Sequence, residues 1–176
     1  MNRAVFLDRD GVLNRVVDRA GEPGSPRSLV EVEIAEDVPT ALRRLVEAGF
    51  VLLGITNQPE IARRQTTASM VEAVNALLLS RLPVREMFVC PHEDADQCDC
   101  RKPKPGLLLR AAAKYDIDLS ASFMVGDRWR DIGAGIAAGC RTVLLEQGWS
   151  KGGQANFTAT SLTEAADWIL AQERAR

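Results

Sequence analysis

The fold is decided by one stretch, AVFLDRDG at residues 4–11, in which an apolar run ends on two carboxylates. The run at residues 4–7 is apolar throughout, which is typical of a strand buried on both faces in a parallel sheet. Asp8 and Asp10 follow at spacing i, i+2, where a glycine turn ends the strand. One such carboxylate can attack phosphorus while the other handles the proton of the leaving group. Asp and Gly are also common in ordinary turns, so the motif needs support from the rest of the chain.

Short apolar runs alternate with helical patterns along the rest of the chain. We predict further strands at residues 51–55, 87–89, 123–125 and 142–145, with 142–145 as the last one. Helices are predicted at residues 37–49, 67–81, 105–114, 132–138 and 161–172. Asp37 is the expected N-cap of the first helix, and Ser69 with Glu72 is the expected capping box of the second. This alternation predicts a Rossmann-like α/β fold of three layers, α/β/α, with a mainly parallel sheet and with function at the carboxyl ends of the strands.

The composition is that of an ordinary globular protein, with 46% hydrophobic and 26% charged residues. A length of 176 residues predicts a single domain, residues 1–176. The 22 basic and 24 acidic residues give a net charge of −2 without runs of like charge, so nucleic acid and membrane surfaces are disfavoured as partners. We expect a soluble, cytoplasmic monomer, because the sequence has neither a long apolar segment nor a signal-peptide pattern.

Three further motifs follow predicted strands. ITNQ at residues 55–58 offers a hydroxyl and an amide that suit phosphoryl oxygens, although the same residues also favour a helix N-cap. RKPKPG at residues 101–106 contains prolines that restrict the backbone, so Lys102 can be fixed against phosphoryl charge, whereas Lys104 is expected to be solvated. GDRWRD at residues 126–131 contains a second acidic pair.

The second acidic pair suits a magnesium site. Asp127 can complete such a site with the Asp8 carboxylate and the Asp10 backbone carbonyl, since Mg²⁺ takes a few oxygen ligands from the protein and keeps several waters. Asp131 can orient one of those waters or a neighbouring side chain. It can equally favour the first turn of the helix at residues 132–138.

Together these motifs resemble the haloacid dehalogenase-like phosphatases, over residues 4–145. They follow the order of that family: Asp8-Arg9-Asp10-Gly11, Thr56-Asn57, Lys102, and Gly126-Asp127 with Asp131. The resemblance implies that Asp8 is the nucleophile of an aspartyl-phosphate mechanism and that Asp10 is the general acid and then the base. It implies that Thr56 and Lys102 contact phosphoryl oxygens and that Asp127 ligates Mg²⁺. At Val12 many members have threonine, so one side-chain hydroxyl is missing here, and we still expect phosphoryl transfer.

Two loops are expected to form the pocket, because the chain has no room for a large cap domain. The segment at residues 11–36, with a Gly/Pro-rich stretch at 21–26, is predicted to be a long loop or flap. Such a loop inside a compact domain is more often functional than incidental. The second loop covers residues 90–102.

Three cysteines and the single histidine of the chain cluster in the second loop as C-x-H-x5-C-x-C. The four residues are Cys90, His92, Cys98 and Cys100. Four N/S ligands are the set of a closed, structural zinc site. The alternative is a group of reduced cysteines beside a surface histidine. A redox role has less support than a metal site, because the C-x-x-C motif is absent. Zinc would restrict Arg101 and Lys102, which follow directly, and so preset the active site.

This loop resembles the zinc-containing branch of the family, which includes heptose 1,7-bisphosphate phosphatases and histidinol-phosphate phosphatases. The stretches at residues 61–63 and 101–106 look more like the heptose enzymes. The short spacing from His92 to Cys98, and Glu93 itself, look more like the histidinol enzymes. We predict removal of the 7-phosphate from the heptose bisphosphate, a small phosphorylated sugar, with histidinol phosphate as the alternative substrate.

The heptose resemblance also implies a set of substrate contacts. These are Asn57, Gln58, Arg101 and Arg128. The guanidinium groups of Arg101 and Arg128 suit a second phosphate through paired N–H donors. A different class of function is a zinc-stabilised binding module without turnover, and the intact pair of Asp8 and Asp10 argues against it. The fourth cysteine, Cys140, is expected to be an ordinary buried thiol.

Overall fold

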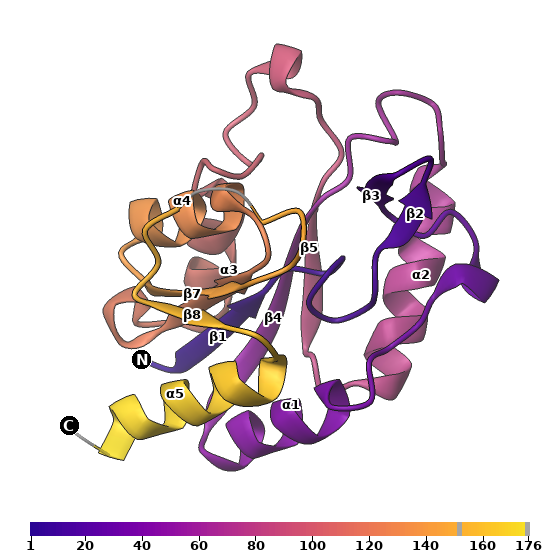
Figure 1. Ribbon diagram of the computed structural model, residues 1–176. Coiled ribbons are helices and arrows are strands. Elements are labelled where there is room, and N and C mark those ends of the chain that lie inside the picture. The colour runs from indigo at the N-terminus through magenta and orange to yellow at the C-terminus, as the bar shows by residue number, and fades with distance from the viewer. Residues whose placement is uncertain (151–152, 175–176) are drawn as a thin grey trace.

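A six-stranded sheet forms the centre of the protein in the computed structural model, which describes residues 1–150 and 153–174 (Figure 1). The strand order is β5-β4-β1-β6-β7-β8, and every neighbouring pair is parallel. The strands are β1 (Arg3–Leu7), β4 (Phe50–Asn57), β5 (Glu86–Cys90), β6 (Phe123–Gly126), β7 (Arg141–Leu145) and β8 (Phe157–Ala159). The prediction that 142–145 is the last strand is wrong. β8 is short and contains a threonine between two apolar residues, so it has no apolar run to reveal it.

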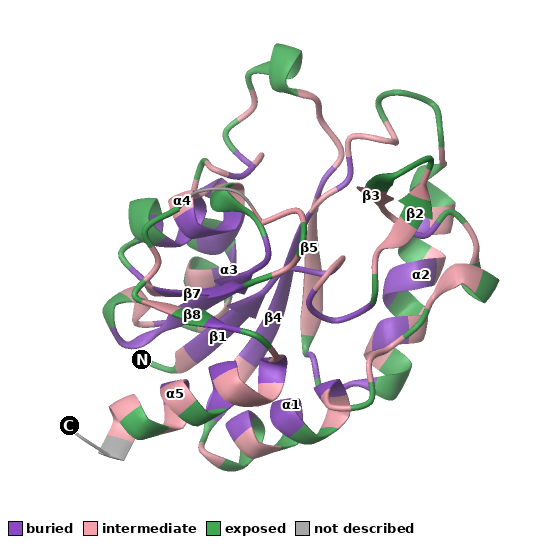
Figure 2. Ribbon diagram, in the orientation of Figure 1, coloured by how far each residue is buried: buried purple, intermediate pink, exposed green. Residues whose placement is uncertain are grey.

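Helices cover both faces of this sheet, as Figure 1 shows. The α-helices of the described residues are α1 (Val38–Glu47), α2 (Ala68–Arg81), α3 (Gly106–Tyr115), α4 (Trp129–Ala138) and α5 (Leu162–Arg174). Alternate residues of β1 face opposite layers, because side chains alternate along a strand. Val5 and Leu7 belong to the core shared with α1, α2 and α5, whereas Ala4 and Phe6 belong to the core shared with α3 and α4. The strand is therefore buried on both faces (Figure 2), which confirms the three-layer α/β/α architecture.

The start of α2 differs from the predicted capping box. The hydroxyl of Thr67 accepts a hydrogen bond from the backbone N–H of Met70 at 3.1 Å, so Thr67 is the N-cap. Ser69 lies inside the helix, and its hydroxyl is 3.0 Å from that of Thr67. The capping box of Ser69 and Glu72 is therefore wrong. The Thr67 side chain satisfies an N-terminal amide that the helix leaves without a partner.

Two other helix starts also differ in detail from the predictions. Asp37 is the N-cap residue of α1, as predicted, but its carboxylate accepts hydrogen bonds from the backbone N–H and hydroxyl of Thr163 and makes none to its own helix. This contact ties α1 to α5. The helix α4 begins at Trp129, three residues before the predicted start at 132. Asp131 is thus inside the first turn, where its Oδ2 accepts from the backbone N–H of Arg128 at 3.0 Å.

The predicted flap at residues 11–36 contains regular structure. Strands β2 (Val17–Arg19) and β3 (Glu22–Gly24) form an antiparallel hairpin, and the short 3₁₀ helix η1 (Leu29–Glu31) follows. Arg19 and Glu31 form an ion pair of 2.6 Å between the hairpin and η1. Figure 1 shows the hairpin beyond the carboxyl ends of the central strands. The flap is therefore an ordered segment at the edge where the motifs end.

A second irregular segment rises from the same edge after β5. It carries the 3₁₀ helix η2 (Asp94–Asp96) and leads into α3, while a further 3₁₀ helix, η3 (Leu119–Ala121), precedes β6. Across the residues that the structure describes, the sheet has no separate cap domain, and no helix has the length and apolar character needed to cross a membrane.

Candidate active site

Asp8 lies at the carboxyl end of β1, where its side chain meets Lys102. The ammonium nitrogen of Lys102 lies 2.8 Å from Asp8 Oδ1 and 2.6 Å from Asp131 Oδ1, and it donates to the carbonyl of Ile55 at 2.7 Å. These three acceptors match the three donors of an ammonium group. Burial alone would lower the pKa of Lys102, yet the charges of Asp131 and Asp8 raise it above its ordinary value. Lys102 is therefore a fixed cation on the floor of the site.

Only one oxygen of Asp8 takes part in these contacts. Oδ1 faces Lys102 and also accepts from the backbone N–H of Arg9 at 2.7 Å. Burial, followed by the charge of Asp131, raises the pKa of Asp8 to about 8, although Lys102 acts in the opposite direction. A further cation nearby would favour the ionised carboxylate, and Oδ2 is the oxygen that remains for chemistry.

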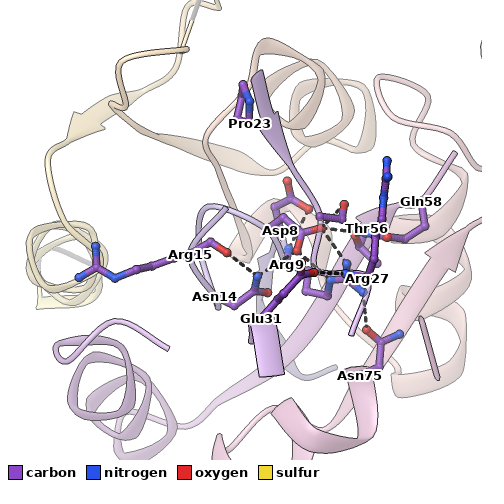
Figure 3. Close-up of polar contacts among 12 residues, drawn as sticks. Asp8, Arg9, Asn14, Arg15, Pro23, Arg27, Glu31, Thr56, Gln58 and Asn75 are labelled. Carbon is purple, nitrogen blue, oxygen red and sulfur yellow. Dashed lines mark hydrogen bonds and ion pairs between the residues drawn. The ribbon is translucent and has the colours of Figure 1, made fainter. Parts of the chain in front are cut away.

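Asp10 is held by four side chains. Figure 3 labels three of them, which are Arg9, Asn14 and Gln58. The fully buried Arg9 donates from Nε and Nη2 to the two carboxylate oxygens at 3.1 and 2.9 Å. Asn14 donates to Oδ1 at 3.0 Å, while Gln58 and Ser25 donate to Oδ2 at 2.8 and 2.9 Å. Burial opposes ionisation here, but the charge and hydrogen bonds of Arg9 lower the pKa of Asp10. The free protein therefore holds Asp10 as a carboxylate.

Gln58, one of the predicted substrate contacts, is not among the residues that line the cavity. Its side chain is fully buried behind the site, and its amide nitrogen donates to Thr56 Oγ1 at 2.8 Å as well as to Asp10. One amide group therefore orients two side chains of different motifs. Thr56 does line the cavity, at the carboxyl end of β4.

Asn57 contacts the backbone of Lys102 through both ends of its amide. Its Nδ2 donates to the Lys102 carbonyl at 3.1 Å, and its Oδ1 accepts from the Lys102 N–H at 3.1 Å. Asn57 also lines the cavity, so a substrate contact remains open to it. The reciprocal pair ties β4 to the segment that carries the lysine.

Three carboxylates form a group that could hold a metal ion. One ligand oxygen from each of Asp8, Asp127 and Asp131 lies within 4.8 Å of the others. Asp127 Oδ1 is buried and has no hydrogen-bond partner among the described residues. An unpartnered buried carboxylate oxygen is costly, and a hard cation such as Mg²⁺ satisfies it. Burial, then the charge of Asp131, raises the pKa of Asp127 to about 6, and a cation bound beside this carboxylate would offset both effects.

The charges of the buried groups agree with a divalent ion. Asp8, Asp127 and Asp131 are buried, and Asp10 is 14% exposed at its side chain. The buried cations that contact them are Arg9 and Lys102. Four ionised carboxylates against two cations leave two negative charges, which one Mg²⁺ would neutralise.

The cysteines and the histidine of the second loop converge on one point. Cys90 Sγ lies 3.7 Å from Cys98 Sγ and 3.3 Å from Cys100 Sγ. His92 Nδ1 lies 3.6 Å from Cys90 Sγ and 3.3 Å from Cys100 Sγ. A tetrahedral zinc ion with Zn–S bonds of about 2.3 Å places its sulfur ligands ~3.8 Å apart. The cluster is therefore slightly tighter than a zinc site, and its donor set is that of a structural one. Cys140 lies outside the cluster and is buried, as expected.

A cavity of about 330 Å³ opens above Asp8 between the flap and the second loop. Its basic lining residues are Arg63, Arg101, Lys102, Arg128 and Arg130. Asp94 of η2 pairs with two of them, accepting from Arg101 Nε at 2.8 Å and from both terminal nitrogens of Arg130 at 2.8 and 3.1 Å. Hydrogen bonds from Arg130 and then Arg101 lower the pKa of Asp94 to about 2. The cavity thus has the paired carboxylates and Lys102 at its floor and arginines around its rim.

Several contributors were not singled out from the sequence. Arg9 lies between Asp8 and Asp10 in the first motif, and a cation between two aspartates is a sequence signal for an ion pair with one of them. Asn75 accepts from Arg9 Nη1 at 3.1 Å, and it is a buried polar residue in the middle of α2. Ser25 and Asp94 reach the site from irregular segments, where no periodic pattern predicts the direction of a side chain.

The fold and this site together define a phosphoryl-transfer enzyme of the haloacid dehalogenase (HAD) type. A family model described as HAD-hydrolase-like matches residues 99–170. D-glycero-beta-D-manno-heptose-1,7-bisphosphate 7-phosphatase of Escherichia coli K12 is 37% identical over 183 residues, covering 95% of this chain and 87% of the relative. The enzyme of that name from Helicobacter pylori J99 is 35% identical, covering 96% of this chain and 97% of the relative.

Solved structures agree with these relatives. The D,D-heptose 1,7-bisphosphate phosphatase of B. bronchiseptica, complexed with magnesium and phosphate, superposes with a TM-score of 0.79 at 30% identity, covering 97% of this chain and 99% of that one. A putative HAD-like phosphatase from Mesorhizobium loti gives a TM-score of 0.78 at 29% identity, covering 98% and 87%. The chain belongs to the family of the heptose-1,7-bisphosphate 7-phosphatases, within the HAD-like hydrolases.

Proposed function

We propose that the protein is a Mg²⁺-dependent phosphomonoesterase that removes the 7-phosphate of D-glycero-β-D-manno-heptose 1,7-bisphosphate, on the route to nucleotide-activated heptose for lipopolysaccharide core or related glycans. The observation that carries this proposal is the contact of Asp8 with Lys102 on the floor of a cavity with an arginine rim. The similarity to the heptose enzymes supports the choice of substrate. We further propose a cytoplasmic monomer that forms one domain, residues 1–176.

In the first half-reaction, Asp8 Oδ2 attacks the phosphorus of the 7-phosphate, and the bond from phosphorus to the sugar oxygen breaks. The electron pair stays on that oxygen, which takes a proton from Asp10. Lys102 and Thr56 offset the charge of the phosphoryl oxygens. Asp10 must carry a proton for this step, so it has to leave part of its present contact with Arg9.

In the second half-reaction, water attacks the phosphorus of the aspartyl-phosphate and gives its proton to the Asp10 carboxylate. The bond from phosphorus to Asp8 breaks, and the electron pair returns to the Asp8 carboxylate as inorganic phosphate leaves. The hydrogen bonds from Arg9 favour the ionised form of Asp10, which is the form that accepts this proton. The same side chain thus acts first as an acid and then as a base.

Two metal ions belong to the proposal. Asp8, Asp127 and the backbone carbonyl of Asp10 would hold Mg²⁺, with Asp131 as a supporting residue that also fixes Lys102. When bound, Mg²⁺ supplies positive charge that offsets the nucleophile and the phosphoryl oxygens. Zinc in the cysteine and histidine cluster would have a structural role. The cluster directly precedes Arg101 and Lys102, so it would fix the start of the basic segment.

The basic rim supports the choice of a bisphosphate. Arg101 and Arg128 would bind the phosphate that is not cleaved, because a guanidinium group can donate two N–H groups to one phosphate. Arg128 also donates to the carbonyl of Pro23 in the flap at 3.1 Å, and Arg101 donates to the carbonyl of His92 at 3.1 Å. These contacts hold the two arginines against the two loops that form the cavity.

A comparison of substrates tests the proposed function. We expect phosphate release with Mg²⁺ to be fastest for the β anomer of the heptose bisphosphate. Histidinol phosphate should have a kcat/KM lower by ~10²-fold or more, because it lacks the second phosphate. The measurement is inorganic phosphate released from both anomers and from histidinol phosphate. A higher kcat/KM for histidinol phosphate would overturn the choice of substrate, and release from none of them would favour the zinc-stabilised binding module.

Asn57→Ala tests the positioning of the lysine. Loss of both hydrogen bonds to the Lys102 backbone is expected to lower kcat/KM for the heptose bisphosphate by ~10- to 100-fold, since each bond contributes about 1 kcal/mol. The control is Asn156→Ala, which removes a polar contact with Thr142; neither residue lines the cavity. Zinc content and the unfolding temperature show whether the fold is intact. Wild-type kcat/KM in a folded Asn57→Ala variant would remove this role.

A further inference from the structure

We propose that Trp149 is a positioning residue for the magnesium site, which fixes Asp127 and sets the affinity for the metal. The indole Nε1 donates to Asp127 Oδ2 at 2.6 Å. The other oxygen of the same carboxylate, Oδ1, is the buried one without a partner. The indole thus occupies one oxygen and leaves the second for a cation. This inference rests on the proposed function only for the identity of the metal.

The Asp127 carboxylate is also confined by the turn that follows β1. Gly11 has a φ of +89°, and a Cβ at this position would overlap Asp127 Oδ2. Only glycine allows the backbone of the first motif to approach the carboxylate this closely. Because the Gly11 backbone and the indole N–H both lie against Oδ2, Asp127 has little freedom to rotate.

The segment that carries Trp149 is tied to the same aspartate. The hydroxyl of Ser150 donates to the Asp127 backbone carbonyl at 2.6 Å, and it also accepts from the backbone N–H of Gln147 at 3.0 Å. The side chain and the backbone of Asp127 are therefore both held by residues that follow β7. Partners that orient a metal-binding residue usually change metal affinity when they are removed.

Trp149 is also placed so that its fluorescence can report on metal binding at Asp127. The indole is half-buried and lines a second cavity of about 310 Å³, whereas Asp127 is fully buried. A cation placed at Asp127 changes the charge of the group that the indole N–H contacts, so tryptophan emission should respond to it. The other two tryptophans lie elsewhere: Trp129 is exposed at the start of α4, and Trp168 packs on Phe123.

Binding of Mn²⁺, followed by electron paramagnetic resonance, tests the proposal, because Mn²⁺ accepts the same oxygen ligands as Mg²⁺. Trp149→Phe removes the N–H donor and keeps an aromatic ring. We expect it to raise the Mn²⁺ dissociation constant about 10- to 100-fold. Trp129→Phe is the matched control and should bind Mn²⁺ as the wild type does. The zinc content and unfolding temperature of Trp149→Phe should equal those of the wild type. If Trp149 had only a structural role, the unfolding temperature would fall.

A second measurement avoids any change at Trp149. In the Trp129→Phe variant, saturating Mg²⁺ should alter tryptophan emission, and Asp127→Asn should abolish that response. Equal Mn²⁺ affinity in Trp149→Phe and Trp129→Phe, or emission that ignores Mg²⁺, would overturn the role of Trp149. Failure of the wild type itself to bind Mn²⁺ would overturn the magnesium assignment first, and so the two failures are distinguishable.

Discussion

Asp8→Asn is expected to lower the rate of phosphate release by more than about 10⁴-fold, because an amide cannot take the place of the carboxylate that attacks phosphorus. The substitution is nearly isosteric, so contacts with Lys102 and the Arg9 backbone can persist through the amide oxygen. Initial rates with the heptose bisphosphate, at saturating Mg²⁺, provide the measurement. Asp10→Asn should also reduce the rate strongly, since it removes the proton donor while leaving the nucleophile in place.

The loss of activity in Asp8→Asn must be distinguished from a loss of folding. Burial raises the pKa of Asp8 from 3.8 to about 8, so in the metal-free protein this carboxyl destabilises the fold at neutral pH, and the destabilisation decreases as pH falls from about 8 towards 3.8. Metal-free Asp8→Asn should therefore unfold at a temperature no lower than that of the wild type. Asp116→Asn, at an exposed site beyond α3, is the control and should keep full activity. Normal phosphate release from folded Asp8→Asn would end the aspartyl-phosphate mechanism.

The architecture and the meeting of the motifs could be predicted for a simple physical reason. Parallel strands end at one edge, so motifs that follow buried strands arrive together whatever their separation in sequence. Asp8 after β1, Thr56 at the end of β4 and Asp127 after β6 obey this rule. Apolar runs alone were enough to locate these strands.

Side-chain direction was harder to predict. A glutamine at position 58 suits either a contact with substrate or a contact with Asp10. Only the packing of β4 against the first motif decides which of the two it makes. Asn57 likewise turns to a backbone that lies 45 residues further along the chain. Asp94 reaches Arg130 across 36 residues from an irregular loop. Such contacts depend on tertiary structure, which local patterns do not encode.

The second loop, residues 90–102, joins local sequence to tertiary contacts, because the four residues that could bind zinc are close in sequence while the contacts of Lys102 are distant. Cys100 directly precedes Arg101 and Lys102, and Lys102 then reaches the carboxylates of two motifs. The lysine backbone is also fastened to Asn57 of β4. A metal in the cluster would therefore fix one end of a segment whose other contacts are catalytic. This arrangement predicts that a change at a ligand far from phosphorus alters the rate of the reaction.

Cys98→Ser is the test of that coupling. We expect zinc to fall from about one ion per chain to nearly none, since zinc binding contributes roughly 10 kcal/mol or more and depends on all four ligands. Phosphate release should fall by ~10²-fold, because a displacement of Lys102 by about 1 Å is enough for such a loss. Asp8, Asp10 and Asp127 remain in place, so Mg²⁺ binding should persist. Elemental analysis by mass spectrometry and initial rates are the two measurements.

The buried thiol outside the cluster provides the matched control. Cys140 lies beyond α4 and is not among the four ligands, so Cys140→Ser should keep about one zinc per chain and most of its activity. Because both variants exchange a thiol for a hydroxyl, the difference between them isolates the metal. If zinc-free wild-type protein were fully active, the loop would not need the metal to position Lys102, and the contacts of that lysine with Asp8, Asp131 and Ile55 would suffice by themselves.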